Sequence, residues 1–502
     1  MADEKTLIDS LEDEANLKKT ENGETAFRST KSGLIDLFAT IGAMRNRSDE
    51  DIINAFEKAY LEDKLLAMKM LFYARDVLQG LGERRVFRVI ETFMAKRYPD
   101  VMKKNLKIIS DFGRWDDLYD FVGTPIEADA FAIMKEQFDN DLSNMAEGKA
   151  ISLLGKWLKS VNTSSNESRK LGRLTAKYFG LSEKEYRKSA AKLRAYTNVV
   201  EVKMTSNQWD SIDYESVPSK AANLYREAFE RHDEDRYNDY VSKLVKGEAK
   251  INAAAIMPYD IVKEYYNKSK TLHWKGSGCE REFIYDEVIE QQWKALPNFV
   301  NGEHAFIVMA DTSGSMSGLP METSVSLAIY FAEKNKGAYH NKFMTFSTTP
   351  SLVSMKDGES LCSKVATVNN TDPGGSTNLE AAFSMILDAA VKGHVDSKEL
   401  PSALVVITDM EIDSRSSGAD LNFMDDMEAR FKDAGYEMPV VVWWNVNARS
   451  NTFHGKFTDP RVRFISGSSA ATFKGLCEHM GETPYELMVN TLNVPRYEVV
   501  RV

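Results

Sequence analysis

The amino-acid sequence predicts a protein in two parts, an α-helical array followed by a doubly wound α/β domain. From about residue 29 to residue 266, apolar residues recur at three- and four-residue steps, as on one face of a helix. After residue 300, apolar runs of strand length alternate with helical stretches, which is typical of a parallel sheet covered on both faces. We therefore expect a flexible acidic N-terminus at 1–25, a helical array at 26–300 and an α/β domain at 301–502.

The helical array is expected to consist of many short amphipathic helices. In one of them, Ile52, Phe56, Ala59 and Tyr60 form a single apolar face. Such helices predict a stack of antiparallel pairs, as in a solenoid, although the sequence has no fixed period. The following segment, 267–300, contains Gly276, Gly278 and Pro297 and is expected to be an irregular connector.

The α/β domain is expected to alternate strands with helices. Its strands are predicted at 305–310, 343–346, 403–408, 440–444 and 462–465. Its helices are predicted at 321–336, 378–391, 421–434 and 470–480. Because the strands are apolar throughout, they belong in a sheet with helices on both faces.

Composition limits the class of protein. No run of about 18 apolar residues is present, so no membrane-spanning helix is expected. The acidic N-terminus lacks the apolar stretch of a secretory signal. Three widely spaced cysteines, Cys279, Cys362 and Cys477, indicate reduced thiols rather than disulfides or a zinc site. We expect a cytoplasmic monomer that does not contact a membrane.

Three loops of the α/β domain contain oxygen ligands at the carboxyl ends of predicted strands, where such sheets bind ligands. The first has the pattern D-x-S-x-S, the second is a glycine-rich turn at 373–378, and the third is a strand-terminal Thr-Asp pair. Hydroxyls and carboxylates are hard ligands that suit Mg²⁺ or Mn²⁺. The simpler alternative for the first loop alone is a turn without a ligand. The candidate metal ligands are Asp311, Ser313, Ser315, Thr377 and Asp409.

Together these loops resemble the metal-ion-dependent adhesion site of von Willebrand A domains. The resemblance implies a magnesium ion that keeps one position open for a carboxylate of a protein partner, which is a binding device rather than a catalytic one. One departure is Met410, where most of that superfamily has glycine. Glu411 and Asp413 follow, either as support for the ligands or as solvated surface.

The helical part also resembles known proteins. Its motifs are Asn22-Gly23, the runs 34–38, 113–118, 155–158 and 186–188, and the run 250–255 ahead of Pro258. They resemble an uncharacterised family of plants, bacteria and viruses that joins such a region to a C-terminal A domain. That architecture is similar to the TROVE module of the Ro autoantigen. The resemblance implies a ring of HEAT-like repeats closed by the A domain, and binding of small structured or single-stranded RNA.

Charge is segregated along the chain, whose net charge is −11. Residues 155–204 hold twelve basic and four acidic residues, a net charge of +8, and residues 75–107 have a net charge of +5. Tyr178, Tyr186 and Tyr196 are interleaved with the basic residues and could stack on bases. The segment 155–204 therefore suits RNA, intramolecular pairing with acidic regions, or an acidic protein partner. The candidate RNA-binding residues are Lys156, Arg169, Lys170, Arg173, Lys177, Arg187, Lys188, Lys192 and Arg194.

No enzyme class is indicated by the sequence. A P-loop is absent, Met316 occupies the central position of a nucleophile-elbow-like run, and Ser313 replaces the glycine of an aspartic-protease motif. The sequence thus predicts a non-enzymatic RNA-binding protein of the Ro type, with a partner at the magnesium site. The alternatives are a metal-dependent interaction or assembly scaffold, such as a viral or host scaffold, that does not bind RNA, and an accessory subunit of an ATPase.

Overall fold

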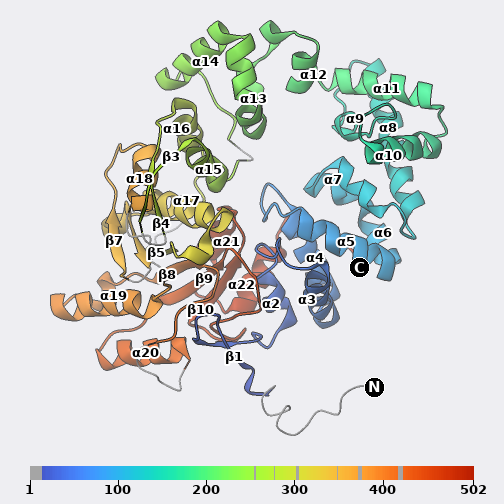
Figure 1. Cartoon of the computed structure of the whole chain (residues 1–502). Coiled ribbons are helices and arrows are strands. Elements are labelled where there is room, and N and C mark those ends of the chain that lie inside the picture. Colours follow the sequence, from blue (N-terminus) through green and yellow to red (C-terminus); the bar gives the residue numbers. More distant parts are fainter. Residues whose placement is uncertain are drawn as a thin grey trace. The chain divides into compact units, whose positions relative to one another are not determined.

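The computed structural model describes residues 14–253, 256–275, 278–300, 305–346, 349–370, 376–415 and 422–502 (Figure 1). The chain divides into two compact units. The sheet unit comprises Met1–Ala67, Gln79–Leu81 and Ile256–Val494, and the helical unit comprises Met68–Leu78, Gly82–Ala255 and Pro495–Val502. The protein is therefore mixed, with an α-helical part and an α/β part, and each unit is described by itself.

The sheet unit is built on a six-stranded sheet with the order β10-β9-β8-β5-β6-β7. Every neighbouring pair is parallel except β6 and the edge strand β7. The five strands expected from the sequence are all present, and β7 was not predicted because it is short and half exposed. The strands are β5 (Phe306–Asp311), β6 (Lys342–Phe346), β7 (Ser351–Ser354), β8 (Ala403–Thr408), β9 (Val440–Asn445) and β10 (Val462–Ser466).

Helices cover both faces of this sheet. Successive residues of a strand point to opposite faces, and in β9 the ring of Trp444 contacts Phe331 of α17 while the ring of Trp443 contacts Phe423 of α20. Phe473 of α21 lies 4.2 Å from the Phe331 ring centroid, on the Trp444 side. Four of the helices close to the sheet are α17 (Leu319–Lys334), α19 (Leu379–Gly393), α20 (Phe423–Asp433) and α21 (Thr472–Glu478). Further helices of the unit are α2 (Gly33–Phe38), α3 (Asp49–Glu62), α18 (Leu361–Asn370) and α22 (Pro484–Leu492).

Part of the N-terminal segment, for which the sequence predicts a flexible tail at 1–25, forms regular structure. Strands β1 (Leu17–Lys19) and β2 (Thr25–Phe27) form an antiparallel hairpin within the sheet unit. Glu24 is 2% exposed and accepts hydrogen bonds from the guanidinium of Arg415. The acidic residues of the hairpin thus have partners. An acidic composition alone does not predict these partners. Residues 1–13 lie outside the described ranges.

The segment 267–300 is not an irregular connector. It contains the end of α15 (Pro258–Lys268), the hairpin of β3 (Lys270–Lys275) and β4 (Gly278–Glu282), and α16 (Glu287–Lys294). Glu290 is buried and accepts hydrogen bonds from the Tyr265 hydroxyl and from the backbone amides of Leu361 and Cys362. The sheet unit consequently begins near residue 256 and also includes residues up to 67, whereas the expected boundary lay at 300.

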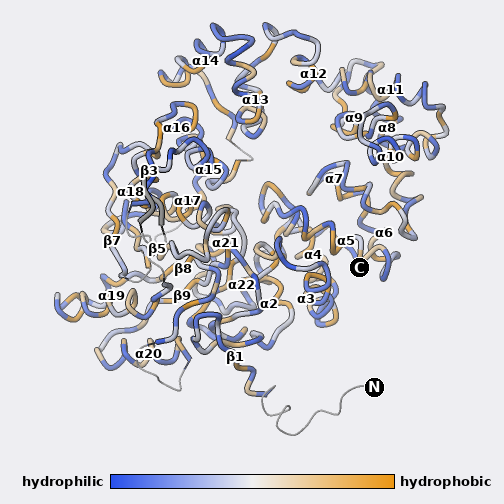
Figure 2. The backbone as a smooth tube through the Cα atoms, viewed as in Figure 1, coloured by the Kyte–Doolittle hydropathy of each residue, from blue (hydrophilic) through white to orange (hydrophobic). Residues whose placement is uncertain are grey.

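The helical unit contains no strand among its described residues. Hydrophilic and hydrophobic residues are interspersed along the helices (Figure 2), and in α11 the buried residues Tyr186, Ala190 and Leu193 recur at three- and four-residue steps. Ser165 and Ser182 cap the first turns of α10 and α11. No helix of the described ranges is long and apolar enough to cross a membrane.

The helices of the helical unit include α5 (Arg85–Arg97), α6 (Pro99–Asn105), α7 (Ile109–Phe112), η2 (Trp115–Phe121), α8 (Glu127–Ala146), α9 (Leu154–Trp157), α10 (Asn166–Tyr178), α11 (Glu183–Tyr196), α12 (Val200–Thr205), α13 (Ser219–His232) and α14 (Glu234–Lys246).

Candidate functional site

The D-x-S-x-S loop begins at the carboxyl end of β5. Asp311 is 0% exposed, and its Oδ1 accepts a hydrogen bond of 2.9 Å from the Ser313 amide. Its Oδ2 accepts a hydrogen bond of 2.6 Å from the hydroxyl of Thr408, the last residue of β8. The hydroxyls of Ser313 and Ser315 lie 3.1 Å apart, with Ser315 at the surface. One carboxylate and two hydroxyls are therefore gathered in a single tight loop.

Asp409 lies beside this loop because β5 and β8 are parallel neighbours, with Ala310 opposite Ile407. Burial, and then the nearby Asp409 carboxylate, raise the pKa of Asp311 to about 7. Thr377 is joined to the same region, because its amide donates to the Asp413 carboxylate at 2.8 Å and its carbonyl accepts from the Asp413 amide at 3.1 Å. Residues 373–375 of its loop lie outside the described residues.

Met410 and Glu411, directly after Asp409, are buried beside the candidate ligands. Met410 is 3% exposed with φ of +71°, in the left-handed region that favours glycine. Its carbonyl lies 3.0 Å from the buried His454 Nε2, which holds the backbone there. Glu411 is 2% exposed and accepts hydrogen bonds from the hydroxyls of Ser450 and Thr452. The expectation of a solvated Glu411 is therefore wrong.

Arg449 is a residue of the site that the sequence did not predict. One of its guanidinium nitrogens lies 2.8 Å from Asp409 Oδ2, and the other lies 3.0 Å from Glu21 of the β1–β2 hairpin. The hairpin is fixed over this segment because the Glu21 amide donates to Glu411 and the Asn22 side chain donates to the Glu411 carbonyl. No local motif marks Arg449, since its partners are distant in sequence.

The residues of this site fit a hard divalent cation. Asp311 is fully buried, and none of its contacts in the described ranges is with a cationic side chain. A buried carboxylate without a counter-charge is costly, and a bound cation would offset that cost. The donor set consists of two carboxylates and hydroxyls, which suits Mg²⁺. Within the described residues there is no group of three or more His, Cys, Asp or Glu side chains that could hold a metal, so the hydroxyls are essential to the candidate site.

The nine candidate RNA-binding residues fall into two groups. Four have partners: Lys156 pairs with Glu201 at 3.0 Å, Arg173 with Glu183 at 3.3 Å, Arg169 with Asn166, and Arg194 with the Leu158 carbonyl. The other five are exposed and make no hydrogen bond or ion pair among the described residues. These five, the free cations of α10 and α11, are Lys170, Lys177, Arg187, Lys188 and Lys192.

The three tyrosines of this region differ in their surroundings. Tyr186 is 1% exposed, and its hydroxyl donates to the Lys159 carbonyl at 2.8 Å, so the expectation that it stacks on a base is wrong. Tyr178 is 39% exposed and stacks on Phe131, with ring centroids 4.4 Å apart. Tyr196 is 39% exposed, and its hydroxyl donates to the Lys149 carbonyl. Only Tyr178 and Tyr196 can therefore meet a ligand.

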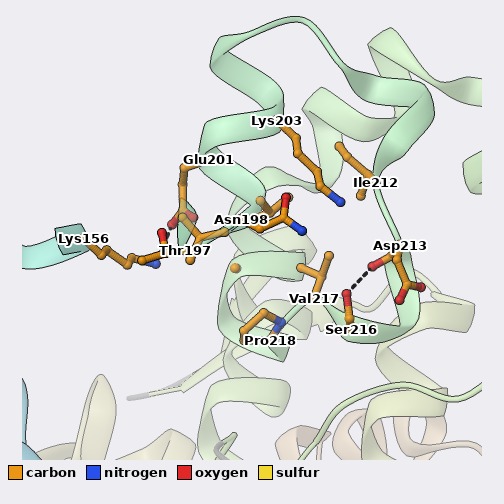
Figure 3. A pocket seen from close by; sticks show the side chains of 13 residues that line it. Lys156, Thr197, Asn198, Glu201, Lys203, Ile212, Asp213, Ser216, Val217 and Pro218 are labelled. Atoms are coloured by element: carbon orange, nitrogen blue, oxygen red, sulfur yellow. Dashed lines mark hydrogen bonds and ion pairs between the residues drawn. The ribbon is translucent and has the colours of Figure 1, made fainter. Parts of the chain in front are cut away.

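A pocket of about 240 Å³ is lined mainly by residues that come after α11 in the sequence (Figure 3). Lys156 and Lys203 lie on its wall, and their ammonium groups contact Glu201 and the Ser211 carbonyl. Ile212, Val217 and Pro218 supply apolar surface. The pocket thus combines cations with an apolar wall next to the end of α11.

Comparisons with known proteins match this chain to two domains of unknown function. Residues 20–146 and 156–301 match a domain of unknown function, DUF2828, and residues 305–491 match a second one, DUF7788. The first match alone spans more than half of the chain. The chain belongs to the DUF2828 family. It is also 30% identical over 520 aligned residues to the uncharacterised protein L728 of Acanthamoeba polyphaga mimivirus, covering 95% of this chain and 87% of that protein.

Proposed function

We propose that this DUF2828 protein is a non-enzymatic RNA-binding protein of the Ro type. In this proposal its helix pairs are HEAT-like, residues 301–502 form a von Willebrand A-type domain, and the closed ring implied by the Ro resemblance stays a prediction. The observation that carries the proposal is the set of five free cations on α10 and α11. Exposed cations without partners are available to phosphate groups, whereas paired cations would first have to break their contacts.

The positions of these cations favour a single binding surface. Lys188 and Lys192 are one helical turn apart on α11, whereas the buried residues Tyr186, Ala190 and Leu193 form its opposite stripe. Tyr178 and Tyr196 stand close in sequence to the cations and offer rings for base stacking. Among the described residues of the helical unit, no acidic side chain contacts the five cations, so the intramolecular alternative would need acidic partners from outside this unit.

The second element of the proposal is a magnesium ion at the candidate metal site. Asp311, Ser313, Ser315 and Thr377 would hold it, with Asp409 acting directly or through water. When bound, the ion supplies a coordination position for an oxygen of a partner, such as a carboxylate. Arg449 orients Asp409 through their ion pair, and Glu411 accepts hydrogen bonds from Ser450 and Thr452, close to Arg449 in the sequence.

A metal-dependent interaction scaffold that does not bind RNA is the competing function. The net charge of −11 favours it, because long-range repulsion weakens nucleic-acid binding. An accessory role beside an ATPase would require that enzyme to co-purify with the chain.

Purification without nuclease, followed by a binding assay, distinguishes these functions. The RNA proposal expects absorbance at 260 nm that ribonuclease removes, and gel shifts with structured or single-stranded RNA at micromolar protein and low salt. A variant with Lys170→Glu, Lys177→Glu and Lys188→Glu should lose most of this binding, whereas Asp311→Ala should retain it. The absence of any shift, or unchanged binding by the triple variant, would replace the RNA proposal by the scaffold.

A further inference from the structure

A dense group of charged side chains occupies the helical unit where α5, η2 and the end of α9 meet. Four cationic side chains converge on one atom, Asp116 Oδ2. Their nitrogens lie 2.8, 3.2, 3.8 and 3.8 Å from it. These four side chains, the cationic cradle, are Arg84, Arg114, Arg88 and Lys159.

Asp116 and Asp117 lie below the surface, Asp120 is 24% exposed, and the cradle cations reach the surface. Asp116 is 5% exposed and Asp117 is 0% exposed, whereas the four cradle side chains are between 28% and 39% exposed. Together the three cradle guanidiniums have about fifteen N–H donors, against about eight lone-pair sites on Asp116 and Asp117. A ligand that approaches these two aspartates from solvent therefore meets the cradle cations first.

The group has more positive than negative charge. A fifth cation, Arg75, is 3% exposed and donates two hydrogen bonds to Asp117. The acidic side chains are Asp116, Asp117, Asp120 and Glu91, and burial followed by the neighbouring Asp120 and Asp117 carboxylates raises the pKa of Glu91 well above its usual range. Five cations against four carboxyl groups leave the group net positive. A phosphate monoester carries about −1.5 to −2 at neutral pH, which is opposite in sign to this net charge.

The cradle is held in position by its surroundings. The guanidinium of Arg114 lies over the ring of Trp157 at 4.1 Å, and Asp117 accepts a hydrogen bond from the Arg114 amide. At Gly113 any side chain would overlap the buried Asp117 and Arg75 groups, so this position requires glycine. The sequence motifs at 113–118 and 155–158 thus converge on one structure, which the metal site and the free cations of α10 and α11 do not use.

We propose that the cationic cradle binds a phosphate group. The group comes either from free phosphate or from the 5′ end of an RNA, and the second source rests on the proposed RNA function. Planar guanidinium groups whose positions are already fixed bind phosphate oxygens in pairs and lose little entropy in doing so. The end of α9 also connects the cradle to the proposed RNA surface, because the Lys159 carbonyl accepts from Tyr186 of α11.

Calorimetric titration of the full chain with sodium phosphate, at fixed ionic strength and with chloride as the reference, tests the cradle. Arg84→Gln combined with Arg114→Gln should weaken phosphate binding by about tenfold to a hundredfold, the usual range for lost charge-assisted hydrogen bonds. Arg84→Lys, which keeps the charge but not the fork, should give a smaller loss. Arg97→Gln is the matched control, because Arg97 is an exposed arginine of α5 outside the cradle. If the double variant does not fold, Arg84→Gln alone serves, since Arg84 is the most exposed of the four.

The titration separates the cradle from the RNA proposal. Phosphate heat no larger than that of chloride, or an equal loss in Arg97→Gln, would overturn the cradle. A 5′-phosphorylated oligonucleotide that binds more tightly than its 5′-hydroxyl form in wild type, but not in Arg84→Gln, supports RNA as the source. Binding of phosphate without any RNA binding supports the cradle with free phosphate and removes the proposed function. RNA binding without phosphate binding supports the proposed function and overturns the cradle.

Discussion

The candidate metal site has two buried aspartates, and two more lie beneath the cationic cradle. The side chains that surround the two pairs are opposite in charge. Asp311 has no cationic partner among the described residues, and Asp409 has only Arg449. In the cradle, Asp116 and Asp117 are surrounded by Arg75, Arg84, Arg88, Arg114 and Lys159. The same side chain therefore prepares one region for a cation and the other for an anion, depending on how many cations are fixed around it.

The largest expected contrast is between neutralising the two fully buried aspartates. Asp117→Asn should lower the free energy of unfolding by about 3–5 kcal/mol, because Arg75 would remain buried without its counter-charge. Asp311→Asn in metal-free buffer should change it by less than about 1 kcal/mol, since the lost hydrogen bond is offset by removal of a buried charge. Urea denaturation of both variants measures these changes in the free energy of unfolding. Similar losses for Asp117→Asn and Asp311→Asn would mean that the surroundings of the two aspartates do not differ as described.

The next effect sharpens the comparison with ligand. Mg²⁺ should raise the free energy of unfolding of the wild type by about 2.7 kcal/mol at a hundred times its Kd, because only the folded site binds it. Asp311→Asn should lose this response in thermal melts with and without EDTA. Ser315→Ala should weaken it, whereas Ser317→Ala should not, because Ser317 is an exposed serine of the same loop that donates to the Gly314 carbonyl. Equal responses of the two serine variants would remove Ser315 from the site.

A pH effect of intermediate size is expected in the helical unit. Burial is the main cause that raises the pKa of Asp120 to about 6, with Asp117 raising it further and Arg88, Glu91 and Arg84 lowering it. A raised folded-state pKa means that the stabilising contribution is complete below the unfolded value of about 4 and is lost as pH rises through about 6. Between pH 4 and pH 7.5, wild type should therefore lose about 2 kcal/mol relative to Asp120→Asn. Parallel pH profiles of the two proteins would contradict this.

The smallest effect concerns the outer ion pair of the metal site. Glu21 is 55% exposed where it meets Arg449, so Glu21→Gln should change the free energy of unfolding by less than about 1 kcal/mol. Glu24→Gln, in the same hairpin, should cost about 3 kcal/mol because Glu24 and Arg415 are both buried. Urea denaturation of the Glu21→Gln and Glu24→Gln variants shows whether burial, rather than position in the hairpin, decides the loss in the free energy of unfolding.

Local patterns in the sequence predict the strands of the sheet. The strands β5 and β8 are buried along their whole length, and the candidate ligands Asp311 and Asp409 lie at their carboxyl ends, whereas metal binding itself stays a prediction. The burial of Tyr186 could also have been predicted, because Tyr186 shares the three- and four-residue spacing of Ala190 and Leu193 in the apolar stripe of α11.

Contacts between distant segments could not be predicted in this way. Glu21 and Glu411 are 390 positions apart, and their contact orders the N-terminal hairpin and buries a residue expected at the surface. Arg449 and the cradle arginines resemble ordinary surface cations in the sequence. Their roles depend on which carboxylates the fold brings beside them, and a single sequence does not reveal these long-range pairings.

The salt dependence of RNA affinity tests the central claim most directly, namely that the free cations of α10 and α11 bind RNA. Each lost phosphate contact should reduce the slope of log affinity against log salt by about 0.7 for single strands, so Lys170→Glu, Lys177→Glu and Lys188→Glu together should reduce it by about 2. The control is Lys392→Glu, Lys432→Glu and Lys474→Glu, three exposed lysines of the sheet unit with the same change in net charge. The account predicts weaker binding and a flatter slope only for the α10 and α11 variant, and equal slopes for both variants would contradict it.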